Sequence, residues 1–317
     1  MKVSLMTWLL LATAGQFLNA VVAILDKYIV SDDKAMPRPF VYAFYSCLLT
    51  SSWILVFGVS LIPGMAALGF PSFAEVQKPT IQVTAMAFLA AYTFFMALVS
   101  MFDALKHSDA SDVMPAIGGV STLSAFGMSY LFFEIPLAPH FVWGVLLLAT
   151  GTFLLSHVRL SHNTSLLLHV FHAGIFFALH YIVMKGLFEE TSFADGFFWS
   201  RVCFVLFALS LLLVPTYYEK VVTQTKSTTK KGGMLIIFTK VLAGVAAFML
   251  LKATDLGDVA VVQALDGLKF VFIILLSLLV GRLIPKAAGE NEFDFKTLIR
   301  KSLYIAIIAV GFVVLFL

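Results

Sequence analysis

The sequence predicts an all-α integral membrane protein with ten transmembrane helices, arranged as two inverted five-helix repeats around a central cavity. Three observations predict this fold: an apolar composition, a series of long apolar runs, and a similarity between the two halves of the chain. Of the 317 residues, 61% are hydrophobic and 12% are charged, whereas a soluble domain has about 45–50% apolar and about 25% charged residues. A water-soluble enzyme is therefore excluded. The formal net charge of +3 is too small to indicate a nucleic-acid partner.

Ten apolar runs follow one another along the chain, and crossing a bilayer takes roughly 20 apolar residues. Because backbone groups in hydrocarbon must be hydrogen-bonded within a segment, and because the runs lack the period-two alternation of a membrane barrel, each run is predicted to be a helix. The first run is interpreted as a span rather than a cleaved signal peptide. The runs cover residues 5–29, 39–61, 80–105, 112–133, 138–157, 164–187, 196–217, 233–252, 258–283 and 297–317.

The polar joint between the third and fourth runs is similar to the joint between the eighth and ninth. Ala104–Val113 aligns with Ala253–Val262. Ile24–Lys27, at the end of the first run, likewise aligns with Ile182–Lys185, at the end of the sixth. Because bias toward apolar residues is weakest in polar joints, this match indicates an internal repeat.

The repeat divides the chain into residues 1–160 and 161–317, with five runs in each half. Since five is odd, the second half enters the membrane with the opposite orientation, as in many secondary transporters. The joints after the odd-numbered runs hold most of the 21 Lys and Arg residues. Because short cytoplasmic loops carry an excess of cations, both termini are predicted to face away from the cytoplasm.

The residues around the fourth run resemble a known transporter family. Ala104-Leu105 is followed by Ser108-Asp109-Ala110, the fourth run contains Pro115 and has Glu134 at its end, and a glycine-containing run from Trp143 to Gly151 comes next. This arrangement is similar to the repeat of the drug/metabolite transporter (DMT) superfamily, specifically its EamA-like branch. The resemblance covers most of both halves, and its motifs are more specific for the fold than for the substrate.

The resemblance implies ten helices in two inverted halves, a central substrate cavity, and export or exchange of a small metabolite by alternating access. It also implies that both termini face the cytoplasm, opposite to the orientation predicted from charge. The second half departs from the family pattern, because Gly281-Arg282 stands where an acidic residue is expected and Lys269 occupies an apolar position. The usual helix-end contact of the second half is therefore left without its acidic residue.

Several charged residues lie within the predicted runs, where a charge costs at least about 2.5 kcal/mol and usually faces a cavity or a partner. Gln263, Asp266 and Lys269 follow one another at intervals of three residues and form one polar stripe on a helix. We expect Lys269, together with Arg201 or Lys240, to attract an anionic group of a substrate. Asp266 would balance the empty site or carry a coupled proton. The alternative is that Asp266 and Lys269 only neutralise each other and that Arg201 extends to the membrane interface.

Three histidines of the sixth run, His169, His172 and His180, fall on one face of a helix. Histidines can ligate metal or relay protons near neutral pH. Only His169 and His172 are close enough in sequence to share an ion, and no Glu or Cys lies nearby. A polar face that lines the cavity is therefore favoured over divalent metal transport, with hydrogen-bonded packing as the third interpretation.

Neutral polar side chains in the first half could supply further hydrogen bonds to a substrate. The candidates are Gln16 and Asn19 in the first run, Tyr45 in the second and Tyr92 in the third, and Trp199 would add an aromatic surface beside Arg201. Such residues also hold helices together in membranes. Neutral groups in one half and cations in the other suit an amphiphilic metabolite with one anionic end.

Two features of the fourth and ninth runs are typical of helix bends. Pro115 precedes Gly118, and Gly267 aligns with Gly118 in the repeat. Close helix packing with a kink is the favoured interpretation. A hinge for alternating access, at which proline frees a backbone carbonyl, is the alternative.

These features favour a secondary active transporter of a small organic metabolite with an anionic group, in the class of amino acids, organic acids or sugar phosphates. A membrane-embedded enzyme and a histidine-lined divalent metal transporter are the alternatives. We expect no cofactor and no resident metal, proton coupling as an option, the lipid bilayer as environment, and a monomer or homodimer. A bacterial inner membrane is the default location, because sorting signals are lacking in the sequence.

Overall fold

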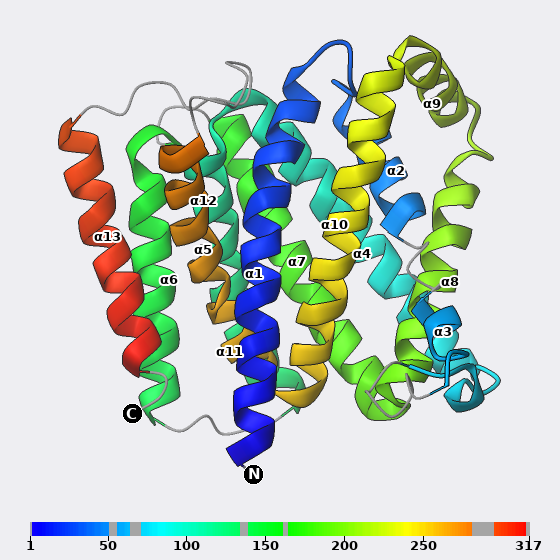
Figure 1. The fold of residues 1–317 in the computed structure, drawn as a ribbon, viewed down its shortest axis with the longest axis horizontal. Coiled ribbons are helices and arrows are strands. Elements are labelled where there is room, and N and C mark those ends of the chain that lie inside the picture. The colour runs from blue at the N-terminus through cyan, green and yellow to red at the C-terminus, as the bar shows by residue number, and fades with distance from the viewer. Residues whose placement is uncertain are drawn as a thin grey trace.

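The computed structural model describes residues 2–50, 56–63, 71–133, 139–160, 164–280 and 295–314. Within these ranges the chain is helical and contains no strand. Figure 1 shows the helices as a bundle, most of them running between the same two ends. They are α1 (Lys2–Ser31), α2 (Pro39–Thr50), α3 (Val56–Val59), the 3-10 turn η3 (Phe73–Glu75), α4 (Ile81–His107), α5 (Ala110–Phe133), α6 (Pro139–Leu160), α7 (Thr164–Glu190), α8 (Phe193–Leu211), α9 (Pro215–Ser227), α10 (Lys230–Leu256), α11 (Val259–Ala264), α12 (Asp266–Val280) and α13 (Phe295–Val314).

Each predicted apolar run contains at least one helix, but two features differ from the prediction. The ninth run is divided into α11 and α12 at Leu265, and α9 is an additional helix that occupies a predicted joint. Among the described residues, five helices are long and apolar enough to cross a membrane: Thr7–Ser31, Ile81–His107, Thr164–Glu190, Phe193–Leu211 and Lys230–Leu256. The chain is therefore a helical membrane protein.

Three of the long helices begin at a hydroxyl side chain that caps the first turn. Thr80, Ser192 and Thr229 precede α4, α8 and α10, and each accepts a hydrogen bond from a backbone N–H of the turn that follows. Such caps satisfy N–H groups that have no partner within the helix. The polar joints of the sequence thus fix where these helices start.

The helices pack in pairs that join the two halves of the chain. Helix α1 lies along α10, and α4 lies along α7. Helix α6 packs between α5 and α13, and α5 also contacts α7. If α1 and α4 of the first half correspond to α7 and α10 of the second, the α1–α10 and α4–α7 pairs are each other's counterparts.

A lysine near the end of α1 and a lysine near the end of α7 make the same kind of contact. Lys27 donates from Nζ to the carbonyl of Ser108, 2.8 Å away at the C-terminal end of α4. Lys185 donates to the carbonyl of Gly257, 3.4 Å away at the C-terminal end of α10. The sequence alignment pairs Lys27 with Lys185 and Ser108 with Gly257, so equivalent positions carry equivalent contacts.

The two ends of the bundle differ. Figure 1 shows the N-terminal end of α1 and the C-terminal end of α13 at the same end of the molecule, and α9 at the opposite end. Helix α9 packs against α2, because the Thr225 hydroxyl lies 2.6 Å from the Tyr45 hydroxyl and the Tyr217 ring lies 4.7 Å from that of Phe40.

Small residues allow the central helices to approach one another closely. A Cβ atom at Gly174 of α7 would lie 2.6 Å from Cβ of Val120 and 2.9 Å from the carbonyl oxygen of Ile117, both on α5. Since backbone atoms cannot move aside cheaply, only glycine fits this crossing.

We expect Gly174→Ala to lower the free energy of unfolding by about 1–3 kcal/mol, the usual cost of overpacking. Thermal unfolding in detergent would measure it. The matched control is Gly127→Ala on α5, where a Cβ meets nothing within 4 Å. The control should be neutral or slightly stabilising, because alanine favours helix. Equal midpoints for the two variants would show that the α5–α7 crossing is not tight.

Candidate functional site

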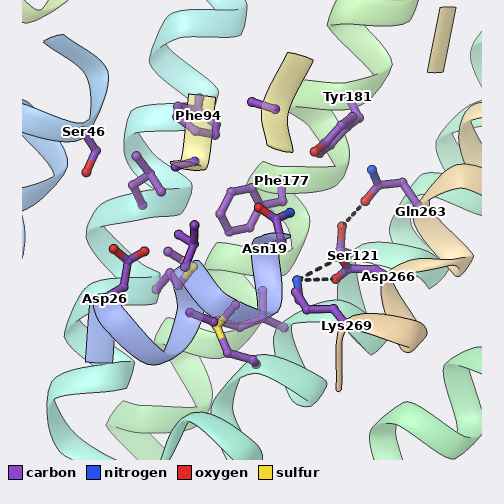
Figure 2. A pocket seen from close by; sticks show the side chains of 18 of the residues that line it. Asn19, Asp26, Ser46, Phe94, Ser121, Phe177, Tyr181, Gln263, Asp266 and Lys269 are labelled. Carbon is purple, nitrogen blue, oxygen red and sulfur yellow. Dashed lines mark hydrogen bonds and ion pairs between the residues drawn. The ribbon is translucent and has the colours of Figure 1, made fainter. Parts of the chain in front are cut away.

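A cavity of about 130 Å³ lies at the centre of the bundle, with walls from α1, α2, α4, α5, α7, α10, α11 and α12. It is large enough for several water molecules. Its wall is apolar in the middle and charged at two places (Figure 2). The polar and charged lining residues are Asn19, Asp26, Ser46, Ser121, Tyr181, Lys240, Gln263, Asp266 and Lys269.

The first charged place is an ion pair between α1 and α10. Lys240 Nζ lies 2.9 Å from a carboxylate oxygen of Asp26, and the side chains are only 3% and 5% exposed. The hydroxyl of Tyr42 donates to the same carboxylate, and the Lys240 ammonium lies 4.0 Å from the centre of the Tyr42 ring. The pair is therefore hydrogen-bonded as well as buried, which a charge pair in a low-dielectric interior requires.

The second charged place is the ion pair at the start of α12. Lys269 Nζ lies 2.8 Å from both carboxylate oxygens of Asp266. Figure 2 shows this pair and Asp26 on opposite sides of the cavity, with Asn19 between them. The two carboxylates and the two ammonium groups cancel in formal charge, so the four side chains leave the empty cavity balanced.

The break between α11 and α12 lies in the cavity wall. Leu265 separates the two helices, and the lining residues Gln263 and Asp266 flank it. The Thr122 hydroxyl donates to the backbone carbonyl of Gln263 (3.1 Å), and the Ser121 hydroxyl donates to its side-chain oxygen (3.0 Å). Side chains of α5 thus supply partners for polar groups at the break, as irregular backbone inside a membrane protein needs.

The two repeat-related glycines have different surroundings. A Cβ at Gly118 would overlap the Phe270 ring and lie 2.9 Å from a carboxylate oxygen of Asp266, so Gly118 lets α5 approach α12 beside the cavity. A Cβ at Gly267 would lie 3.2 Å from Ile308 of α13. Pro115 lies inside α5, which continues past it to Phe133. Close packing at Gly118 is observed, and a hinge at these residues stays a prediction.

Arg201 does not line the cavity, although it is buried. Its guanidinium lies 5.0 and 4.5 Å from the ring centres of Phe197 and Phe204, and its Nε donates to the Ser200 hydroxyl at 3.4 Å. Within the described part of the chain, its Nη2 has no hydrogen-bond partner and no carboxylate forms an ion pair with it. The Arg201 side chain is only 2% exposed, so the alternative prediction that it extends to the membrane interface is wrong.

The three histidines of α7 share the predicted face, and this face contacts α4 rather than the cavity. His169 lies 3.4 Å from the Asp103 carboxylate, the His172 ring is hydrogen-bonded to the Ser100 hydroxyl, and His180 to a backbone carbonyl of α4. Each histidine thus has its own partner, which matches the packing interpretation. Within the described ranges, no group of three His, Cys, Asp or Glu side chains could hold a metal ion.

Four other predicted residues also lie outside the cavity wall. Trp199 donates from Nε1 to the carbonyl of Gln77 at 2.9 Å, and Tyr45 contacts α9. Tyr92 is exposed on the outer surface. Gln16 is buried, and its side-chain oxygen has no partner among the described residues. Of the neutral candidates in the first half, only Asn19 lines the cavity.

Asp26 is the charged lining residue that the sequence analysis missed as a site residue. It stands next to Lys27 at the end of the first run, where charge is expected at a helix end. The repeat contains the signal that could have revealed it, because the aligned residue of the second half is the apolar Met184. Glu134 and Arg282, which entered the family comparison, lie outside the described residues.

Comparison with known proteins shows the fold alone. No family model and no curated protein matches the sequence, whereas 28 chains of solved structures match. One crystal structure covers 95% of this chain and 96% of its own, with a TM-score of 0.62 and 15% sequence identity. The fold of the whole chain therefore occurs in a solved protein of distant sequence.

We expect Asp26→Asn to lower the free energy of unfolding by about 3–5 kcal/mol, because it leaves the buried Lys240 without its carboxylate. The midpoint of thermal unfolding in detergent would measure the loss. The double variant with Lys240→Met should recover much of it, since no buried charge then remains.

The matched control is Asp255→Asn, which breaks the half-exposed ion pair of Lys252 and Asp255 (2.8 Å). That change should cost about 0–1 kcal/mol, as for other solvated pairs. A double variant less stable than Asp26→Asn would contradict the charge-burial explanation.

Proposed function

We propose that the chain is a secondary active transporter of the DMT superfamily, in its EamA-like branch, and that it moves a small organic metabolite by alternating access. The observation that carries the proposal is the central cavity, which two ion pairs and a broken helix surround. Discontinuous helices at the centre of the bundle are a recurring feature of transporter binding sites. The fold shared with a distant solved structure is compatible with this proposal but carries no function.

Ten membrane crossings in two inverted five-helix repeats are part of the proposal. An inverted repeat would map the α1–α10 pair onto the α4–α7 pair, and both pairs are in contact. The equivalent contacts of Lys27 and Lys185 also support it. These contacts lie at opposite ends of the bundle, because α1 and α7 end at opposite ends. Inverted halves place one copy of each contact near each side of the membrane.

An anionic group on the substrate is supported by the charges in and around the cavity. Asp26 and Asp266 balance Lys240 and Lys269. Arg201 lies behind the wall, close enough to the lining residue Tyr181 for electrostatic interaction, and no described carboxylate is paired with it. The site therefore has an excess of one positive charge. In a low-dielectric environment this excess favours an anionic ligand.

The distribution of cations supports an orientation. Exposed lysines and arginines gather at the end that carries α9, whereas Glu75, Glu189, Glu190 and Asp255 lie at the end with the two termini. By the rule that cytoplasmic loops are rich in Lys and Arg, we place α9 in the cytoplasm and both termini on the opposite side. A bacterial inner membrane is the proposed setting.

Flux into proteoliposomes tests the function. The panel holds amino acids, organic acids and sugar phosphates, each with and without a proton gradient, and at least one anionic substrate should show saturable uptake. Lys269→Gln should reduce that uptake about tenfold or more, because a charge-assisted hydrogen bond contributes about 1.5–3 kcal/mol.

Lys252→Gln is the matched control, since Lys252 also pairs with a carboxylate three residues away but does not line the cavity. It should transport like the original protein. If Lys269→Gln leaves saturable flux unchanged, the cavity is not the transport site. If no substrate of the panel shows flux, transport of these classes is refuted.

Cysteine labelling tests the orientation. Both native cysteines, Cys47 and Cys203, are free and buried, so an introduced cysteine supplies the accessible thiol. In intact cells, a membrane-impermeant maleimide should label Glu75→Cys, whereas Thr223→Cys on α9 should react only after permeabilisation. The reverse pattern would place both termini in the cytoplasm.

A further inference from the structure

A group of exposed cations forms what we call the basic rim, at the end of the bundle that carries α9. Its members are Lys34, Arg38, Lys220, Lys226, Lys230 and Lys231, all of them exposed. None of them forms a salt bridge with a described residue. Cations gathered on one surface create a positive potential that attracts an anionic partner.

Backbone and hydroxyl contacts bring these cations together from three parts of the chain. The backbone N–H of Thr229, which precedes α10, donates to the carbonyl of Lys34 at 3.1 Å. The Thr228 hydroxyl donates to the carbonyl of Ala35 at 2.9 Å. The start of α10 is thus fixed to the joint after α1, and α9 packs against the start of α2. The basic rim is part of the folded surface.

Acidic groups near the basic rim do not balance it. Asp33 and Glu219 are exposed, and Asp32 is half-buried. The Asp32 carboxylate accepts a hydrogen bond from the backbone N–H of Lys34 at 2.9 Å and so stabilises the turn. Within residues 32–38 and 219–231, six cations stand against three carboxylates, so these segments carry a net positive charge.

The basic rim lies directly beside apolar side chains that face outward. On α10, Met234, Ile237 and Phe238 are 71%, 56% and 59% exposed, and Met234 follows Lys231 within one helical turn. Tyr218 on α9 is exposed as well. In a membrane protein such apolar side chains contact lipid tails, so cations one turn away lie at the level of the headgroups.

We propose that the basic rim binds the headgroups of anionic phospholipids in the leaflet at this end of the molecule. Charge complementarity and the adjoining apolar surface together fit a lipid, because a soluble polyanion would use only the charges. Helix α9 then lies at the membrane surface, where basic residues attract anionic lipid. This binding is independent of what the cavity transports.

Lipid titration of the delipidated full chain in detergent tests the proposal. Phosphatidylglycerol and phosphatidylcholine with the same acyl chains are added in turn, and native mass spectrometry counts the lipids bound. The original protein should bind phosphatidylglycerol more tightly. Each single change to glutamine at Lys220, Lys226, Lys230 or Lys231 should reduce this preference up to about fivefold, and the quadruple variant at least about tenfold.

Lys78→Gln is the matched control, because it removes an exposed lysine at the other end of the bundle, and it should keep the full preference. The single variants keep the test decisive if the quadruple variant fails to fold. Equal affinities for the two lipids in the original protein, or an unchanged preference in the folded variants, would overturn the proposal. Displacement of phosphatidylglycerol by an equal charge concentration of poly-glutamate would assign the basic rim to soluble acidic chains instead.

Discussion

Every charge inside this bundle must be matched by an opposite charge or by a ligand, because hydrocarbon provides no water to solvate it. Asp26 and Lys240 satisfy the requirement across the α1–α10 interface, and Asp266 and Lys269 satisfy it within one turn of α12. The buried side chains of Lys27 and Asp195 are instead hydrogen-bonded to backbone groups. Arg201 has neither arrangement among the described residues, since aromatic rings and a hydroxyl are its contacts. The helices around the cavity therefore complete two ion pairs and leave one buried cation, which is not part of the cavity wall, without a carboxylate partner among the described residues.

The proposed repeat would relate the α1–α10 interface to the α4–α7 interface. At the level of the cavity, these two interfaces differ in their side chains. Asp26 on α1 aligns with Met184 on α7, which is fully buried. In the middle of α7 the polar contact with α4 is the hydrogen bond between His180 and the carbonyl of Ala90 at 2.9 Å, whereas the contacts of His172 with Ser100 and of His169 with Asp103 lie nearer the start of α7. Separating α4 from α7 would mainly expose apolar surface, whereas separating α1 from α10 would free two charges that water or a ligand can take up. The proposed repeat thus relates two interfaces that differ in buried charge.

The sequence predicts the helices well because the apolar runs follow directly from the thickness of the membrane. Gln263, Asp266 and Lys269 all line the cavity, although the break at Leu265 places Gln263 on α11 and the other two on α12. The partner of Lys240 could not be predicted, because Asp26 is 214 residues away and no periodicity relates them. Arg201 was expected in the cavity from residue type alone, and only packing decides how α8 is rotated about its axis. Position 265 is a leucine and not a proline or glycine, so the residue type at this position does not predict the break.

The break between α11 and α12 has an electrostatic consequence. A helix begins with backbone N–H groups that have no partner in the helix, and its dipole places about half a positive charge at that end. Because α12 starts at Asp266, this partial charge lies inside the bundle, in the cavity wall. An unbroken helix would keep it at the membrane surface. The C-terminal end of α11 places the opposite partial charge one residue away, so the break puts a local dipole in the cavity wall, and this part of the potential does not depend on pH.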